Sequence, residues 1–381
     1  MKKIKVLFII NSLAGGGAER VLVHILENLD RNKFGISLCT FFPQVDYNVP
    51  SDIKYFSFNK RNYLDLVSII YKLKNIFQSG KYDVIVSFLT YTNIFVTISW
   101  LLSGKKIPLV ISEHCNPIDN LKNQRFSRIK LKLISKLYPF ANVVIAVSEG
   151  VKNSLSSCFK IPTTKLKVIY NPINIKKIDT LKREKITEEP VFKNDNKPII
   201  ISCGRLTKQK NYSLLIKAMK ILKDAGIKAN LIILGKGEEE KRLKKLVKDL
   251  NLEKEVKFLG FKKNPYKYIS KATIFVLSSK YEGFPNVLLE AMACGTPVIS
   301  TNCPYGPSEI IEHGKNGFLV PVDDEYSLAE KIKILLKEPT LRRNFAIEGR
   351  KIVERKFDLK KIIKQWEDLI IYTVEAMRCL K

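Results

Sequence analysis

The fold class follows from residues 199–237, which read IIISCGRLTKQKNYSLLIKAMKILKDAGIKANLIILGKG. The β-branched and apolar run at Ile199–Cys203 is typical of a buried strand, and Leu231–Leu234 is a second run of this kind. Between them, Ser213–Ala225 has apolar residues at helical spacing. Because strand, helix and strand follow one another, this stretch predicts a parallel β-α-β unit.

The same alternation of short apolar runs and longer amphipathic segments extends over the rest of the chain. Further candidate strands are Ile4–Ile10, Ile36–Phe42, Val84–Phe88, Pro108–Ser112, Val143–Val147, Val256–Leu259, Thr273–Leu277 and Val298–Thr301. This order predicts parallel sheets with helices on both faces. For 381 residues we expect an α/β protein of two doubly wound, Rossmann-like domains that face a central cleft.

The domain boundary is expected just after Asn171-Pro172, where a strand-like run ends. Residues 1–172 would form the N-terminal domain and residues 197–358 the C-terminal domain. Residues 173–196 are charged, weakly apolar and flanked by prolines, so we expect a linker that acts as a hinge. Residues 359–381 are expected to form a final helix. Packing of this helix back across the hinge, onto the N-terminal domain, is one arrangement that the sequence allows.

The chain carries 66 Lys and Arg against 37 Asp and Glu, a net charge of +29. The excess is spread over both halves, and its field favours anionic partners such as phosphates, acidic lipid headgroups or nucleic acid. The seven cysteines are odd in number, and none has C-x-x-C spacing. This usage predicts a reducing compartment, with neither a zinc site nor a disulfide framework.

Two apolar segments are interpreted as parts of the fold. Residues 1–13 (MKKIKVLFIINSL) begin with charge, but no small-residue cleavage pattern follows, so a first strand is expected rather than a signal peptide. Residues 84–102 carry no charge, yet their Ser, Thr and Asn side chains would lack partners in lipid. We therefore predict a strand and a buried helix there.

Two loops that follow candidate strands could bind an anion. Gly15-Gly16-Gly17 lies between a strand and a helix, where glycines permit close backbone approach to a phosphate or sugar. A dinucleotide-binding turn or a plain tight loop is the alternative, and Arg20 breaks the G-x-G-x-x-G pattern. The second loop, Gly204–Lys210, places Arg205, Lys208 and Lys210 directly after a strand. These cations could bind a diphosphate, or the loop could be ordinary solvated surface.

The most specific stretch is Glu282–Glu290 (EGFPNVLLE). Pro285-Asn286 is expected to open a short helix that ends at Gly295, so that the backbone amides of Asn286–Leu288 point towards an anion. The two glutamates are placed to hold two ends of a polyhydroxylated ligand. A hydrolytic carboxylate pair and a structural helix with a solvated Glu290 are the alternatives.

Six motifs occur in order along the chain. They are Gly15–Arg20 (GGGAER), Ser112-Glu113-His114, Asn171-Pro172, Gly204-Arg205-Leu206 with Lys210, Gly235-x-Gly237, and E-x7-E at Glu282 and Glu290. Over essentially the whole chain they resemble the family 4 retaining glycosyltransferases, which have the GT-B fold. Residues 87–94 (SFLTYTNI) and 112–116 (SEHCN) resemble the N-acetylgalactosaminyltransferases that extend polyprenyl-diphosphate-linked glycans. Enzymes of capsule, O-antigen and teichoic-acid synthesis share many of these sequence motifs.

The resemblance implies a role for each motif. The C-terminal domain would bind the nucleotide sugar, with Arg205 and Lys210 neutralising the donor diphosphate as the glycosidic bond breaks. Glu290 would bind the ribose hydroxyls, Glu282 would hold hydroxyls of the transferred sugar, and the 235–237 loop would line the base pocket. The remaining donor-binding residues would be Gly16, Gly17, Gly204, Gly235, Gly237, Asn286, Val287 and Leu288.

His114, from the N-terminal, acceptor-side domain, would contact the transferred sugar. A catalytic base and a histidine satisfied in the core are its alternatives. In the family, retention is attributed to same-face attack, with the donor phosphate receiving the acceptor proton. The resemblance therefore implies no metal and no cofactor beyond a nucleotide-sugar co-substrate, expected to be UDP-linked.

The expected function is retaining transfer of an N-acetylhexosamine from a UDP donor to a lipid-linked or cell-surface glycan. A GT-B relative with other chemistry, such as a nucleotide-sugar epimerase or a phosphorylase, is one alternative. A nucleic-acid-binding protein is suggested by charge alone, but no recognition-helix or aromatic-strand pattern supports it.

The acceptor side contains a basic, amphipathic stretch at Arg125–Tyr138 (RFSRIKLKLISKLY). One predicted helical stripe is apolar, and the adjacent one is basic. The basic stripe consists of Arg125, Arg128, Lys132 and Lys136. Such a helix suits an anionic membrane surface or a lipid diphosphate, although an ordinary lysine-rich surface helix has the same pattern. We expect a cytoplasmic enzyme attached peripherally to the inner face of the membrane.

Overall fold

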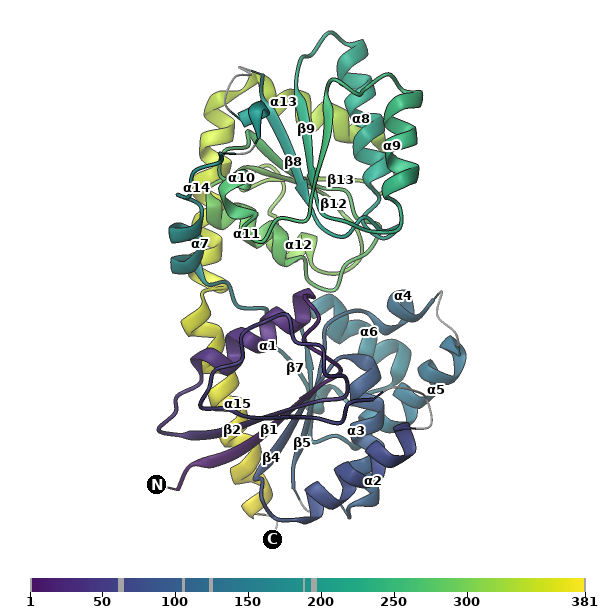
Figure 1. Ribbon diagram of the computed structural model, residues 1–381, viewed down its shortest axis with the longest axis vertical. Coiled ribbons are helices and arrows are strands. Elements are labelled where there is room, and N and C mark those ends of the chain that lie inside the picture. The colour runs from purple at the N-terminus through teal and green to yellow at the C-terminus, as the bar shows by residue number, and fades with distance from the viewer. Residues whose placement is uncertain are drawn as a thin grey trace. The chain divides into compact units, whose positions relative to one another are not determined.

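The computed structural model describes residues 2–60, 65–104, 107–122, 126–187, 189–192 and 197–379 (Figure 1). The chain divides into two compact units, which are described separately below. Unit 1 comprises Met1–Pro172 and Leu359–Lys381, and unit 2 comprises Ile173–Asp358.

Unit 1 is built on a parallel sheet with the strand order β3-β2-β1-β4-β5-β6-β7. Its strands are β1 (Ile4–Ile10), β2 (Phe34–Thr40), β3 (Lys54–Ser57), β4 (Val84–Phe88), β5 (Leu109–Glu113), β6 (Val143–Ala146) and β7 (Leu166–Val168). The chain runs outward from β1 to β3 and then returns to β4 on the other side of β1. The direction of winding therefore reverses between β1 and β4, which is where ligands bind in sheets of this kind.

Helices cover both faces of this sheet. They are α1 (Gly17–Asn28), α2 (Asp65–Gln78), α3 (Thr90–Leu102), α4 (Pro117–Leu121), α5 (Ser127–Leu137), α6 (Glu149–Phe159) and α15 (Leu359–Cys379), with 3₁₀ turns η1 (Tyr138–Phe140) and η2 (Thr163–Lys165). Helices α1 and α15 lie on one face, and α2, α3 and α5 lie on the other (Figure 1).

The last helix, α15, contributes to the core of unit 1. Ile362, Trp366 and Ile370 are spaced four residues apart, so they share one face of the helix, and all three are buried against the sheet. The Glu367 carboxylate accepts a hydrogen bond from the backbone N–H of Asp30, with N···O 2.9 Å. The C-terminal segment is therefore part of the first unit's packing.

Unit 2 has a parallel sheet with the strand order β10-β9-β8-β11-β12-β13. Its strands are β8 (Ile199–Cys203), β9 (Asn230–Leu234), β10 (Val256–Gly260), β11 (Ile274–Leu277), β12 (Val298–Thr301) and β13 (Phe318–Val320). Its helices are α7 (Ile175–Leu181), α8 (Tyr212–Asp224), α9 (Glu240–Asp249), α10 (Tyr266–Ile269), α11 (Asn286–Cys294), α12 (Pro307–Ile310), α13 (Glu325–Lys337) and α14 (Pro339–Lys356), with η3 (Pro190–Phe192). Here the winding reverses between β8 and β11.

The predicted fold class, two doubly wound α/β domains, is confirmed by these two sheets. Strands β1, β4, β8 and β12 have the predicted bounds, whereas β3 and β13 were not predicted, and β7 was noted only as a strand-like run that ends at Asn171-Pro172. These three strands lie at sheet edges and have only three or four residues. Their apolar runs are too short to be distinguished from loops by pattern alone.

The segment expected to be a linker contains ordered structure. Helix α7 belongs to unit 2, and its Ile175 and Ile178 are buried. Arg350 of α14 donates to both carboxylate oxygens of Asp179 on α7, with N···O 2.9 and 2.7 Å. The part of residues 173–196 next to the boundary is thus packed onto unit 2, while residues 188 and 193–196 lie outside the described part of the chain.

The uncharged stretch 84–102 forms β4 and α3, as predicted. Two of its polar side chains bond to the preceding turn of α3: Thr97 Oγ1 donates to the Asn93 carbonyl at 2.7 Å, and Ser99 Oγ donates to the Phe95 carbonyl at 2.8 Å. Over the described ranges, no helix combines the length and the apolar character needed to span a bilayer.

Candidate active site

The strand order of unit 2 brings together two motifs that lie far apart in the sequence. Strands β8 and β11 are neighbours, and the loops at their carboxyl ends are Gly204–Asn211 and Ser278–Pro285. The Gln209 side-chain amide donates to the Tyr281 carbonyl at 2.9 Å, and Ser278 Oγ donates to the Lys210 carbonyl at 2.8 Å. The loops that carry the basic motif and the first glutamate therefore lie side by side.

Lys210 and Glu282 form an ion pair at this junction. The Lys210 Nζ to Glu282 Oε1 distance is 2.6 Å, and the side chains are 17% and 7% exposed. Ser279 Oγ donates to the same carboxylate oxygen at 2.5 Å. A largely buried pair of this kind holds both groups in fixed positions, and the sequence interpretation had named both residues without predicting that they are paired.

Arg205 is exposed on the loop that follows β8, and its side chain has no hydrogen bond or ion pair with any residue that the structure describes. Lys210, five residues further along the same loop, is bound to Glu282. Lys210 is therefore held by a carboxylate, whereas the Arg205 guanidinium is available to an anion.

Helix α11 begins beside this pair. Its N-cap residue is Pro285, whose side chain has no oxygen that could bind the first amide groups. The Leu288 N–H already donates to the Pro285 carbonyl at 3.0 Å. A Cβ on Gly306 would lie 2.6 Å from Pro285 Cδ, so that glycine permits the loop to pack closely.

Glu290 lies one turn inside α11 and is only 5% exposed. The alternative of a solvated Glu290 on a structural helix is therefore wrong. A buried carboxylate near the start of a helix is held in place by its surroundings, which is a requirement for binding specific hydroxyl groups.

The glycines of unit 2 permit close backbone packing between the β8 and β9 loops. A Cβ on Gly235 would lie 1.9 Å from the Gly204 carbonyl oxygen, and one on Gly237 would lie 2.3 Å from the Leu206 carbonyl oxygen. Gly204 itself has the Tyr212 hydroxyl 3.1 Å from the position of a Cβ. These contacts require glycine for packing, independently of any ligand.

One exposed aromatic residue at this edge was not predicted. Phe261 follows β10 directly and is 70% exposed. The preceding Gly260 accepts a hydrogen bond from the Gly235 N–H, with N···O 2.8 Å. Phe261 therefore lies beside the loop expected to line the base pocket, and its ring offers an apolar face to a flat ligand. The signal in the sequence was an aromatic residue directly after a strand.

In unit 1, the glycine loop leads into α1, whose N-cap is Gly16 and whose first residue is Gly17. A Cβ on Gly16 would lie 2.1 Å from the Glu19 carboxylate, and the Tyr47 hydroxyl donates to the Gly16 carbonyl at 3.0 Å. Gly15 has φ +77°, a conformation that favours glycine. The loop is thus shaped by local contacts, with a carboxylate already near the start of the helix.

His114 follows β5 and is 7% exposed. Its Nε2 lies 3.1 Å from Ser112 Oγ, and its ring stacks on Phe88, whereas Nδ1 is buried without a partner among the described residues. Burial lowers the pKa of the imidazole to about 3. The ring is therefore neutral at pH 7 and only weakly basic, which suits a sugar contact better than proton abstraction.

Glu113 is a buried carboxyl group that the sequence interpretation quoted within a motif but did not assign to the site. Thr90 Oγ1 donates to one carboxylate oxygen and the Tyr138 hydroxyl donates to the other, both at 2.7 Å. Burial raises the pKa of this carboxyl to about 7, against the opposing effect of these hydrogen bonds. Glu113 thereby ties the segment before His114 to α3 and η1.

On α5, Arg128, Lys132 and Lys136 are exposed, as are the apolar side chains of Phe126 and Ile129. Arg125, the fourth residue of the predicted basic stripe, lies outside the described residues. The helix therefore presents neighbouring basic and apolar side chains, and it anchors itself through the buried Ile134.

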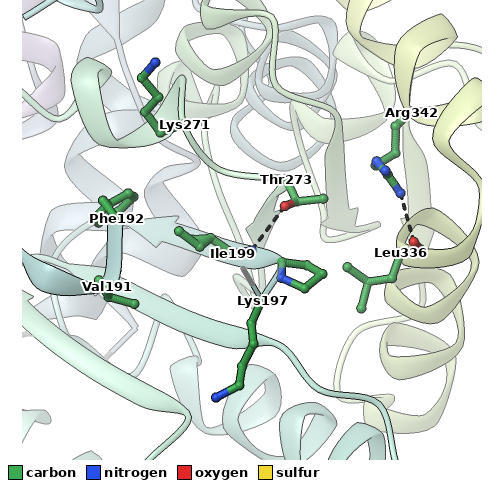
Figure 2. A pocket seen from close by; sticks show the side chains of 9 residues that line it. Val191, Phe192, Lys197, Ile199, Lys271, Thr273, Leu336 and Arg342 are labelled. Carbon is green, nitrogen blue, oxygen red and sulfur yellow. Dashed lines mark hydrogen bonds between the residues drawn. The ribbon is translucent and has the colours of Figure 1, made fainter. Parts of the chain in front are cut away.

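A cavity of about 370 Å³ lies at the opposite edge of the unit 2 sheet, near the amino ends of β8 and β11 (Figure 2). Arg342 points into this region, but its guanidinium donates to the Leu336 carbonyl at 2.9 Å. This cavity shares no residue with the loops described above. Within the described ranges, no group of three or more His, Cys, Asp or Glu residues is arranged to hold a metal ion.

Comparison with known proteins agrees with this arrangement. Residues 15–177 match the family described as Glycosyltransferase Family 4, and residues 183–352 match Glycosyl transferases group 1. The structure of Anabaena Alr3699/HepE in complex with UDP has a TM-score of 0.79 and 24% identity, and the match covers 97% of this chain and all of that one (100%).

Two curated relatives from Campylobacter jejuni are similar over nearly their whole length. One is N-acetylgalactosamine-N,N'-diacetylbacillosaminyl-diphospho-undecaprenol 4-alpha-N-acetylgalactosaminyltransferase, at 34% identity over 93% of this chain and 96% of the relative. The other is GalNAc-alpha-(1->4)-GalNAc-alpha-(1->3)-diNAcBac-PP-undecaprenol alpha-1,4-N-acetyl-D-galactosaminyltransferase, at 29% over 96% of this chain and 98% of the relative.

The two sheets and these relatives define the protein as a glycosyltransferase of the GT-B fold that uses a nucleotide sugar. The chain belongs to glycosyltransferase family 4.

Proposed function

We propose that this family 4 enzyme transfers an N-acetylhexosamine from a UDP donor, with retention of configuration, to a lipid-linked glycan. The observation that carries the proposal is the junction of the β8 and β11 loops, where Arg205 and the Lys210–Glu282 pair lie beside the start of α11. The acceptor and sugar class are proposed from the names of the two Campylobacter jejuni relatives. The nucleotide is proposed from the UDP bound to the similarly folded HepE.

In the proposed reaction, the acceptor hydroxyl forms a bond to the anomeric carbon on the face from which the diphosphate leaves. The carbon–oxygen bond to the diphosphate breaks, and a donor phosphate oxygen receives the acceptor proton. Arg205 and Lys210 would stabilise the charge that develops on the diphosphate. Glu282 would hold hydroxyls of the sugar, Glu290 would hold the ribose, and neutral His114 would contact the sugar through Nδ1.

We propose that the reaction needs no divalent ion, because the two cationic side chains of the proposed diphosphate site would neutralise the diphosphate in place of a metal. Asn286 and Val287, at the start of α11, would direct their backbone amides towards the same phosphates.

A donor panel tests this function. UDP-GalNAc, UDP-GlcNAc, UDP-galactose, UDP-glucose and GDP-mannose would be compared by thermal stabilisation and then by hydrolysis, with and without EDTA. At a concentration of about 100 times its Kd, we expect a UDP-N-acetylhexosamine to raise Tm by a few degrees. Its rate of hydrolysis should be the same with and without EDTA. Preference for an unsubstituted hexose or for GDP would refute the donor assignment, and loss of turnover in EDTA would refute metal independence.

We further propose peripheral membrane attachment through α5. Its exposed Arg128, Lys132 and Lys136 would contact anionic headgroups, while Phe126 and Ile129 would enter the interface. The protein should co-sediment with vesicles rich in phosphatidylglycerol at low salt, and Lys132→Glu with Lys136→Glu should reduce binding about tenfold or more. Lys228→Glu with Lys257→Glu, the same change in charge in unit 2, serves as the control. Absence of wild-type binding to anionic vesicles would exclude this attachment.

A further inference from the structure

His114 belongs to a stack of three aromatic rings inside unit 1. The imidazole and the Phe88 ring are stacked, with centroids 5.2 Å apart and planes 27° apart. Phe88 also stacks on the indole of Trp366, with centroids 5.5 Å apart and planes 17° apart. The stack therefore connects the segment after β5 to β4 and to the C-terminal helix.

Core packing fixes the far end of this stack. Phe88 is fully buried and Trp366 is 2% exposed. Ile362 and Ile370, one turn before and after Trp366 on α15, are buried in the same core. A side chain enclosed in this way has one accessible rotamer, so the plane of the indole is set by the fold.

Polar contacts alone do not fix the His114 ring. The hydrogen bond between Nε2 and Ser112 Oγ constrains one point on the ring, and Nδ1 has no partner in the described part of the chain. Rotation of the imidazole about the axis through that one contact is opposed by the face of the Phe88 ring. The Phe88 ring has no polar atoms and is itself stacked on Trp366. The direction in which Nδ1 points therefore depends on the stack.

We propose that Trp366 is a positioning residue for sugar transfer, which acts through Phe88 to fix the plane of the His114 ring and thereby the direction of Nδ1. The inference rests on the proposed contact between His114 and the donor sugar. It assigns a role in the reaction to α15, a helix that otherwise only completes the core of unit 1. The same stack excludes water from the imidazole, in keeping with its lowered pKa.

The test compares Trp366→Leu, Trp366→Phe and a control, Ile370→Ala, in the full chain. Ile370 is buried on the same helix, so its truncation lowers the unfolding temperature without removing a ring from the stack. Trp366→Phe keeps an aromatic face at the end of the stack. Loss of stability is thereby separated from loss of ring support, and near-UV circular dichroism verifies that each variant is folded.

The first readout is the His114 imidazole itself. The chain has 3 histidines, so selective ¹³C labelling gives few ring signals, which His24→Gln and His313→Gln assign. In the wild type, Trp366→Phe and Ile370→Ala, the His114 signal should not titrate between about pH 5 and 8. In Trp366→Leu it should change its chemical shift and begin to titrate in that range.

The second readout is transfer from the UDP-sugar selected by the donor panel. Trp366→Leu should lower kcat about tenfold or more through misplacement of the ring, while KM for the donor stays within about twofold. Trp366→Phe and Ile370→Ala should keep both constants within about twofold.

An unchanged His114 signal together with an unchanged kcat in folded Trp366→Leu would overturn the proposal. If Ile370→Ala lowered kcat as much as Trp366→Leu, the effect would be one of stability and the proposal would also fail. If the His114 signal responds to Trp366→Leu but the wild type turns over no nucleotide sugar, the ring stack stands and the proposed function fails.

Discussion

Replacement of Arg205 by alanine is expected to lower the rate of sugar transfer by about 100- to 1,000-fold, the usual cost of losing one group that stabilises developing negative charge. The Arg205 side chain is exposed and has no hydrogen-bond or ion-pair partner among the described residues, so its truncation breaks no polar side-chain interaction of the folded protein. The thermal unfolding temperature should therefore stay within about 2 °C of the wild type. Initial rates with the UDP-sugar selected by the donor panel measure the loss.

Two variants make this result specific. Arg205→Lys keeps the positive charge but loses the bidentate hydrogen bonding to phosphate oxygens. Its rate of sugar transfer should therefore lie between those of the wild type and Arg205→Ala. Lys228→Ala removes one positive charge from the loop before β9, at the opposite edge of the same sheet, and should leave the rate within about twofold. Near-normal transfer by Arg205→Ala would place the diphosphate elsewhere.

Replacement of Lys210 by alanine is expected to damage both activity and stability. It removes the second cation from the proposed diphosphate site and leaves the Glu282 carboxylate, 7% exposed, with Ser279 as its remaining hydrogen-bond donor in the described part of the chain. An uncompensated buried charge of this kind costs about 3–5 kcal/mol. We therefore expect a loss of transfer of about 100-fold or more and a lower denaturation midpoint, measured by urea unfolding.

A double variant separates the two effects of Lys210. In Lys210→Met with Glu282→Gln, no charge is left unpaired, so the urea midpoint should return to near the wild-type value. Transfer should remain low, because neither the cation nor the sugar-binding carboxylate is restored. Recovery of transfer along with stability would show that Lys210 only maintains the structure of the loop.

Much of the fold could be predicted because its central strands carry an unambiguous pattern. Strands β1, β4 and β8 have five or more residues each and are apolar except for Lys5, Ser87 and Ser202, and all but the first two residues of β1 and the last residue of β8 are buried. The edge strand β3, Lys54–Ser57, has two exposed residues followed by two half-buried ones, and among the described strands β2 alone pairs with it. A strand of that kind is specified by its partner rather than by its own residues.

The candidate site was predictable in its residue types but not in its internal contacts. Arg205, Lys210, Glu282 and Glu290 could be named because their motifs follow strands and open a helix. The Lys210–Glu282 pair joins residues 72 positions apart, and only the adjacency of β8 and β11 brings them together. The stack of His114 on Phe88 and Trp366 depends in the same way on tertiary packing, which no local pattern records.

The discontinuous composition of unit 1 has a consequence for biosynthesis. Because α15 is translated after residues 173–358, the part of the sheet face against which it packs stays uncovered while unit 2 is being made. At ordinary ribosomal speeds that interval lasts roughly 10 to 40 seconds. The nascent chain therefore exposes Phe88 and its apolar neighbours to chaperones or to other nascent chains until the last turns of α15 leave the ribosomal exit tunnel. Residues 173–358, by contrast, are contiguous and can fold as soon as they emerge.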